Sequence, residues 1–150
     1  MISNQLFNEL TVKIKHYGRS LQPPSSDNKL NALRVRSRQE LGCDISNDYC
    51  DLLATVNGLD WNGLVIYANE RVPIPGYSDR FIEGFVEGNL DFRDFEPWKD
   101  YLIYADDGVV LFTYHISQQR YEVVLRVGMS LLESFDTFND LLTNALSGHM

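Results

Sequence analysis

Few side chains in this sequence have the types and spacing that catalysis or metal binding requires. The three histidines, His16, His115 and His149, are far apart in the chain, so a metal site would need an unusual convergence in the fold. Cys43 and Cys50 form no C-x-x-C pair, and neither has a neighbouring base in the sequence. No glycine-rich phosphate loop, serine-hydrolase elbow or zinc-protease motif occurs. We therefore expect no enzymatic activity, no metal and no cofactor.

Asp106 and Asp107 are adjacent carboxylates that could act as a general acid and a general base. They precede Gly108, and an Asp-Gly pair between two apolar stretches indicates a tight hairpin turn because it tolerates positive φ angles. We favour the turn as the explanation of this pair, and catalysis is the alternative.

The acidic residues are concentrated in one part of the sequence. The formal net charge is −8 at pH 7, and residues 79–107 hold nine acidic and three basic groups, a net charge of −6 in 29 residues. Such a field repels nucleic-acid phosphates and attracts cationic surfaces, so we expect a basic protein as the partner. A solvated acidic face that only keeps the protein soluble is the alternative.

The basic residues offer no comparable nucleic-acid site. Arg34, Arg36 and Arg38 occupy alternate positions of a predicted helix, where their side chains spread around the helix axis. No aromatic residue alternates with them to stack on bases. We therefore expect no direct contact with nucleic acid.

The 150 residues are expected to form a single domain, because one core serves chains of about 100–200 residues. Residues 1–27 are predicted to be an N-terminal helix and a surface loop. No apolar run approaches the roughly 18 residues that span a membrane, and residues 1–5 lack the pattern of a signal peptide. We therefore expect a cytoplasmic protein that does not bind membranes.

Apolar residues with helical spacing lie mainly near the two ends of the chain. The predicted helices cover residues 4–16, residues 27 or 28 to 41, and a segment that begins at Ser46 or Asn47. A further helix is expected to begin at Ser78 or Asp79, with Phe81, Ile82, Phe85 and Val86 facing inward, and a last one near residues 134–146, capped by Ser134 or Asp136 and with Phe135 on its apolar face.

Strands are predicted between these helices, at residues 64–67, 101–105, 109–114 and 121–127. Residues 71–76 contain two prolines and are expected to be a sheet edge or a turn. Helices that precede and follow a block of strands favour an α+β fold. We predict a largely antiparallel sheet of about four to six strands, packed against N-terminal helices and a C-terminal helix.

Residues 40–63 combine two glycines that are expected to end helices, a residue that can cap a helix, and a stripe of apolar residues. Gly42 stands where a helix end needs a positive φ angle, and Ser46 or Asn47 can cap the next helix. Asn57 and Gly58 are expected to end that helix. The predicted stripe consists of Tyr49, Leu52, Leu53 and Val56.

These residues resemble a known family. The motif Glu40-Leu41-Gly42, Asp48-Tyr49, Leu52-Leu53, Asn57-Gly58, Trp61 and the segment Gly63 to Tyr67 resemble the opening of the SUKH superfamily. Residues 101–103 and 134–138 resemble its closing segments, so the likeness covers about residues 28–146. Where the family usually has a proline before the Asp-Tyr pair, this chain has Ser46-Asn47, which changes only a helix cap.

The superfamily contains the yeast regulator of cell-wall synthesis and many small bacterial proteins, most of which are implied to be immunity proteins. Together with the acidic region, this resemblance predicts a protein that binds and neutralises a cognate toxin domain delivered by neighbouring bacteria. The toxin is expected to be a nuclease whose basic surface the acidic face covers. We expect a monomer or weak dimer. The alternative is a non-catalytic regulatory or scaffold module that binds a cellular protein.

The predicted contact residues are of two kinds. Carboxylates are expected to steer the partner, and aromatic side chains are expected to anchor it. The steering carboxylates are Asp79, Glu83, Glu87, Asp91, Asp94 and Glu96, and Asp60 is a further predicted contact residue beside Trp61. The aromatic residues are Trp61, Phe92, Phe95 and Trp98. For Trp61, a position over the core and a position in an interface are both open.

Overall fold

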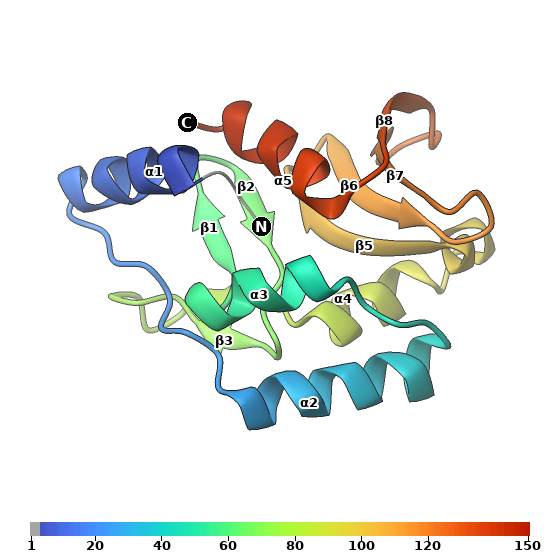
Figure 1. Cartoon of the computed structure of the whole chain (residues 1–150), viewed down its shortest axis with the longest axis horizontal. Coiled ribbons are helices and arrows are strands. Elements are labelled where there is room, and N and C mark those ends of the chain that lie inside the picture. Colours follow the sequence, from blue (N-terminus) through green and yellow to red (C-terminus); the bar gives the residue numbers. More distant parts are fainter. Residues whose placement is uncertain (1–3) are drawn as a thin grey trace.

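An antiparallel sheet of six strands is the centre of the computed structural model, which describes residues 4–150 (Figure 1). The strand order is β1-β2-β5-β6-β7-β8, and every neighbouring pair is antiparallel. The strands are β1 (Leu59–Trp61), β2 (Leu64–Ile66), β5 (Tyr101–Asp106), β6 (Val110–His115), β7 (Arg120–Leu125) and β8 (Leu131–Phe135). A separate pair joins β3 (Val72–Pro73) to β4 (Phe81–Ile82). The predicted α+β class is confirmed.

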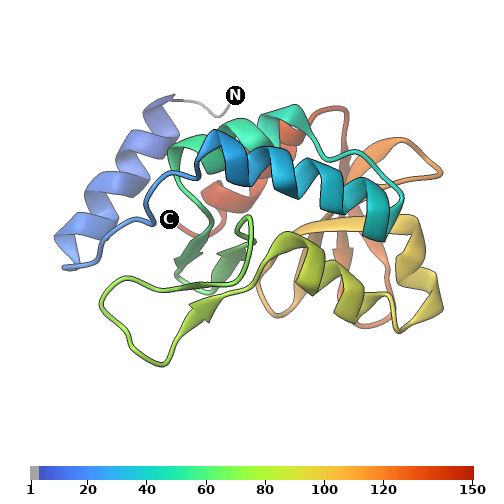
Figure 2. The same cartoon turned by 90° about the horizontal axis from the view of Figure 1, so that it is seen from below.

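Five α-helices of the described chain pack around this sheet. They are α1 (Asn4–His16), α2 (Asp27–Arg36), α3 (Asn47–Thr55), α4 (Phe85–Phe92) and α5 (Phe138–Ser147). Of these, α3, α4 and α5 all contribute a ring to the cluster around Tyr104 of β5. A π-helical turn, η1 (Ser37–Leu41), extends α2, and a 3₁₀ turn, η2 (Glu96–Asp100), precedes β5. Figure 2 shows α2 and α3 on one side of the molecule and α4 with the β3–β4 segment on the other. None of the helices within residues 4–150 is long and apolar enough to cross a bilayer.

Four aromatic side chains from α3, α4, β5 and α5 meet in the core. Tyr104 lies at its centre, with ring centroids 4.8 Å from Tyr49, 5.1 Å from Phe85 and 5.1 Å from Phe138. All four side chains are buried. The Tyr49 hydroxyl donates to the carbonyl of Tyr67 at 2.5 Å, so a polar tip inside the core has a partner.

Residues 40–63 adopt most of the geometry that their types predict. Gly42 has a φ of 72°, and the Ser46 hydroxyl accepts hydrogen bonds from Asp48 N and Tyr49 N at the start of α3. Gly58 has a φ of 85°, and a methyl group added to it would lie 2.9 Å from the carbonyl oxygen of Ile66. Glycine is needed there both for the backbone angle and for the close approach of β2. The predicted stripe Tyr49, Leu52, Leu53 and Val56 is buried.

Two predicted helix boundaries are wrong. The helix expected from Ser78 or Asp79 begins only at Phe85, because residues 81–82 pair with β3 instead. Phe81, predicted to face inward, is consequently 46% exposed. The last helix begins at Phe138 with Thr137 as its cap, and Phe135 belongs to β8, a strand that pairs with β7. Spacing within one segment cannot reveal a partner strand that lies elsewhere in the chain.

Candidate acidic binding site

The helix α4, which carries Glu87 and Asp91 of the acidic segment, is held against the sheet by two polar side chains. The buried amide of Asn89 accepts from Ile103 N at 2.7 Å and donates to Ile103 O at 2.9 Å, as a neighbouring strand would. It also donates to Phe85 O at 2.8 Å within its own helix. Arg93 donates to the carbonyl oxygens of Leu41 and Tyr101. These bonds fix the direction in which the acidic side chains of α4 point.

Four of the seven predicted carboxylates have no cationic partner. Asp79, Asp91 and Asp94 are exposed, and their side chains form no hydrogen bond or ion pair with any described residue. Glu83 is half-buried and accepts only from the neighbouring Gly84 N–H, at 3.0 Å. Carboxylates without an ion-pair partner keep their full charge available to an incoming cationic surface.

The other three predicted carboxylates are already paired. Asp60 contacts Arg80 at 3.3 Å, and Glu96 contacts Lys99 at 2.7 Å. Glu87 contacts Arg36 at 2.7 Å and thereby joins α4 to α2. Pairing cancels much of the field of these three groups at a distance, so they contribute less to steering than the sequence indicates.

The predicted aromatic anchors differ sharply in exposure. Trp98 is 4% exposed and packs edge-on against Phe92 and Tyr101, and Trp61 is 9% exposed over the core. Side chains buried in this way offer a partner almost no surface, so we withdraw both tryptophans as anchors. Phe95 is 57% exposed and Phe92 is half-buried. The aromatic surface beside the acidic residues therefore comes from these two phenylalanines.

A cavity of about 410 Å³ opens between α4 and the sheet. We call it the acidic pocket. It is lined by Val65, Tyr67, Glu83, Gly88, Asp91, Phe92, Asp106 and Arg126. Three of these residues, Glu83, Asp91 and Phe92, were predicted as contact residues from the sequence.

Five separate segments build the acidic pocket. Val65 of β2 and Asp106 of β5 are cross-strand partners, so their side chains lie on the same face of the sheet. Tyr67 follows two residues later in extended chain and points to that face as well. On α4, Gly88 and Asp91 are three residues apart and share one side of the helix. A methyl group added at Gly88 would lie 3.1 Å from Cε2 of Tyr67, so glycine lets the helix rest against this ring.

The acidic pocket is electronegative. Asp106 pairs with Arg126 at 2.7 Å, and the Arg126 guanidinium lies 5.2 Å from the ring centroid of Phe92. Three carboxylates and one guanidinium leave a net charge of −2. Burial raises the pKa of the Tyr67 phenol, and the nearby Asp106 carboxylate raises it further. The pocket is therefore suited to a positively charged ligand.

Three lining residues with polar side chains, Tyr67, Asp106 and Arg126, were not predicted as contact residues from the sequence. Asp106 was assigned to the turn, and its Oδ1 does accept from Gly108 N at 2.6 Å while its Oδ2 pairs with Arg126. Tyr67 and Arg126 were assigned to strands without a further role. The acidic residues around Asp106 in the sequence could have indicated a binding role for it. Nothing in the local sequence connects Tyr67 or Arg126 to Asp106.

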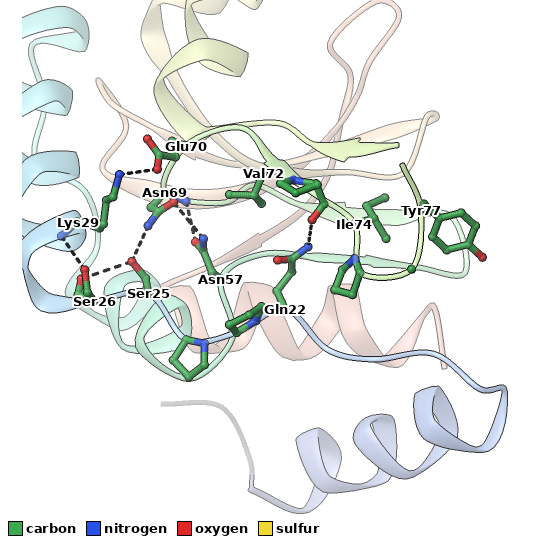
Figure 3. Close-up of a pocket in the computed structure, with 15 residues that line it drawn as sticks. Gln22, Ser25, Ser26, Lys29, Asn57, Asn69, Glu70, Val72, Ile74 and Tyr77 are labelled. Atoms are coloured by element: carbon green, nitrogen blue, oxygen red, sulfur yellow. Dashed lines mark hydrogen bonds and ion pairs between the residues drawn. The ribbon is translucent and has the colours of Figure 1, made fainter. Parts of the chain in front are cut away.

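A second hollow, of about 680 Å³, lies between the loop before α2 and the loop that contains β3 (Figure 3). Its buried polar groups bond to one another. Asn69 donates to Ser25 Oγ at 2.6 Å and accepts from Asn57 Nδ2 at 3.0 Å, and Gln22 donates to Pro73 O at 2.7 Å. The amide groups of this hollow thus already have partners within the protein. Their bonds connect the two loops, so we assign the hollow a structural role.

A histidine between two carboxylates is the arrangement most similar to catalytic chemistry. His115 Nε2 lies 2.9 Å from Asp100, and its Nδ1 lies 3.0 Å from Glu122. Ser117 Oγ is 3.5 Å from His115 Nε2, but it donates to Asp100 at 2.5 Å. Both imidazole nitrogens face carboxylates, so neither is available to activate Ser117 as a nucleophile. Within residues 4–150, no group of His, Cys, Asp and Glu could hold a metal ion.

Comparison with known proteins assigns no family: neither a family model nor a curated protein matches the chain. The resemblance to the SUKH superfamily thus rests on the motif of residues 40–67 and on the closing segments.

Proposed function

We propose that this protein is a SUKH-type immunity protein that binds and neutralises a cognate toxin domain. The observations that support this most directly are the unpaired carboxylates Asp79, Glu83, Asp91 and Asp94 and the exposed ring of Phe95, which follows Asp94 in the chain. Unpaired acidic groups beside an exposed aromatic side chain combine long-range attraction with a hydrophobic contact.

The proposed partner is a basic nuclease. A nuclease must hold phosphates on a positively charged surface, and an acidic face of matching extent can cover that surface. Electrostatic attraction raises the association rate before nucleic acid is cut. We propose that binding takes place in the cytoplasm, with the protein as a monomer or weak dimer that contacts neither nucleic acid nor membrane.

Co-expression tests this function. A basic toxin domain encoded beside this gene is produced in bacteria with and without the protein, and growth and complex formation are measured. We expect the protein to restore growth and to co-purify with the toxin domain. Continued growth arrest without a complex would contradict the proposal, and association with a housekeeping protein would then favour the regulatory or scaffold alternative.

Charge reversal tests the surface. The double variant Asp91→Lys/Asp94→Lys changes two unpaired carboxylates, and Asp51→Lys/Asp136→Lys changes two exposed carboxylates on α3 and before α5. We expect the first variant to slow association about tenfold at low salt and the second to have little effect. Stopped-flow measurements at about 20 mM and about 500 mM salt give the rates. Equal slowing by both variants would show that only net charge matters.

A further inference from the structure

The acidic pocket contains a polar group without a partner. Tyr67 is 5% exposed, and its hydroxyl forms no hydrogen bond with the residues described here. Its ring rests on Gly88, and the phenol interacts electrostatically with Asp106, Glu83, Asp91 and Arg126, all of which line the pocket. The ring is buried, but the hydroxyl oxygen is not among the buried unsatisfied atoms and faces the pocket without a protein partner, so it is available to a ligand that enters.

The charges indicate what could enter. Three carboxylates face one guanidinium, and the Arg126 guanidinium is already engaged by Asp106 and Phe92. Asp91 has no partner within residues 4–150, and Glu83 bonds only to the adjacent backbone N–H. The pocket therefore lacks a cation to complement Glu83 and Asp91.

The origin of the acceptors in separate segments favours a planar cation. The described acidic side chains do not converge into a group that could hold a metal ion, although three of them share a cavity of about 410 Å³. A guanidinium presents five N–H donors in a plane and can reach separated oxygens together, whereas an ammonium is a compact point charge.

We propose that the acidic pocket binds one arginine side chain of the partner, whose guanidinium donates to Glu83, Asp91 and the Tyr67 hydroxyl oxygen. This inference rests on the proposed function in one respect, because the toxin domain supplies the arginine. The surrounding carboxylates steer the partner, and the pocket then fixes its position through this side chain.

The first test uses a capped Gly-Arg-Gly peptide, with citrulline and lysine peptides of the same length as controls. Amide shifts of the labelled protein are followed by NMR. We expect the arginine peptide to bind weakly, with a Kd on the order of millimolar, and to shift residues 67, 88 and 91. The neutral citrulline peptide should bind at least about tenfold more weakly, and lysine should fall between them. Equal shifts with citrulline would overturn the proposal.

The second test separates the pocket from the general acidic field. Asp91→Asn and Asp94→Asn remove the same charge from unpaired carboxylates three residues apart, but only Asp91 lines the pocket. We expect Asp91→Asn to weaken arginine-peptide binding about tenfold and Asp94→Asn to weaken it less than about twofold. Equal weakening by both variants would overturn the proposal.

Tyr67→Phe tests the hydroxyl by itself. This hydroxyl forms no hydrogen bond with another described residue, so its removal should leave the denaturation midpoint nearly unchanged. We expect arginine-peptide binding to fall about threefold to tenfold in the same variant. Unchanged peptide binding would show that the hydroxyl takes no part.

The outcomes for the pocket and for the immunity function are distinguishable. If the protein binds the arginine peptide but does not protect cells from the toxin, the arginine pocket is supported and the immunity function is contradicted. The opposite outcome is that the protein protects cells but does not bind arginine selectively. If Asp91→Asn, Asp94→Asn and Tyr67→Phe then protect equally well, the proposed function stands and the arginine pocket is rejected.

Discussion

Asp100 shows how one carboxylate can stabilise the adjoining ends of two strands, β5 and β6. It accepts from the hydroxyl and the backbone N–H of Ser117 and pairs with His115, whose ring stacks on Tyr101 with centroids 4.3 Å apart. The hydrogen bond from the Ser117 hydroxyl is the largest cause that lowers the pKa of Asp100, and His115 lowers it further. The ionised form of Asp100 is thus the form that the folded protein prefers.

A lowered pKa has a definite consequence for stability in acid. Asp100 stabilises the fold above its unfolded pKa of about 4, and this contribution is lost as the pH falls through its lower folded pKa. Asp100→Asn and Ser117→Ala should both flatten the pH dependence of the free energy of unfolding below about pH 4. Because the side chain is 42% exposed, solvent screening should keep the effect below about 1 kcal/mol. Urea denaturation between about pH 2 and pH 7 measures it. An unchanged slope in both variants would contradict this role.

At the scale of elements, α4 is the piece that positions the acidic pocket. The side-chain amide of Asn89 on α4 bonds to the backbone N–H and C=O of Ile103, as a neighbouring strand would. The register between β5 and β6 shifts at this point, between Ile103 and Ala105. The helix is short, so side-chain bonds to the sheet matter more for its position than its own helical bonds.

Replacement of Asn89 should therefore be costly. Asn89→Ala leaves the buried N–H and C=O of Ile103 without partners, and we expect a loss of about 2–4 kcal/mol in the free energy of unfolding. Leu90→Ala, at the neighbouring exposed position of the same helix, should cost less than about 1 kcal/mol. Equilibrium denaturation of both variants makes the comparison. Similar losses would mean that helix propensity, and not the amide, decides the position of α4.

At the scale of the whole molecule, one core joins the two ends of the chain. Leu10 and Ile14 of α1 belong to the same buried cluster as Leu141 and Leu146 of α5. A small second cluster under the β3–β4 pair contains Ala68, Ile74 and Ile82. A shared core of this kind predicts that residues 4–150 unfold as one cooperative unit.

The two tryptophans can test this cooperativity. Trp61 lies on β1 beside Tyr17, with ring centroids 5.8 Å apart, and Trp98 lies on η2 beside Tyr101. Trp98→Phe and Trp61→Phe each leave one fluorescent reporter. Within each variant, we expect the fluorescence and far-UV circular dichroism midpoints in urea to coincide. A fluorescence midpoint that precedes the circular dichroism midpoint would reveal a part that unfolds separately.

Features that depend on neighbouring residues could be predicted from the sequence. The bounds of α1, the left-handed backbone of Gly42, the Ser46 cap and the Asp-Gly turn all follow from hydrogen bonds and steric limits within a few residues. The acidic run and its sign were also visible, because charge is a property of composition.

Features that depend on distant partners were decided by the tertiary structure. Residues 81–82 and 131–135 became strands because partner strands elsewhere supplied their hydrogen bonds. The burial of Trp98 and the pairing of Glu87 with Arg36 depend on packing between elements. Tyr67, Asp106 and Arg126 meet Glu83 and Asp91 only in the folded chain. The sequence by itself thus determined local backbone geometry and the total charge, whereas folding decided which of those charges stand unpaired and which share a pocket.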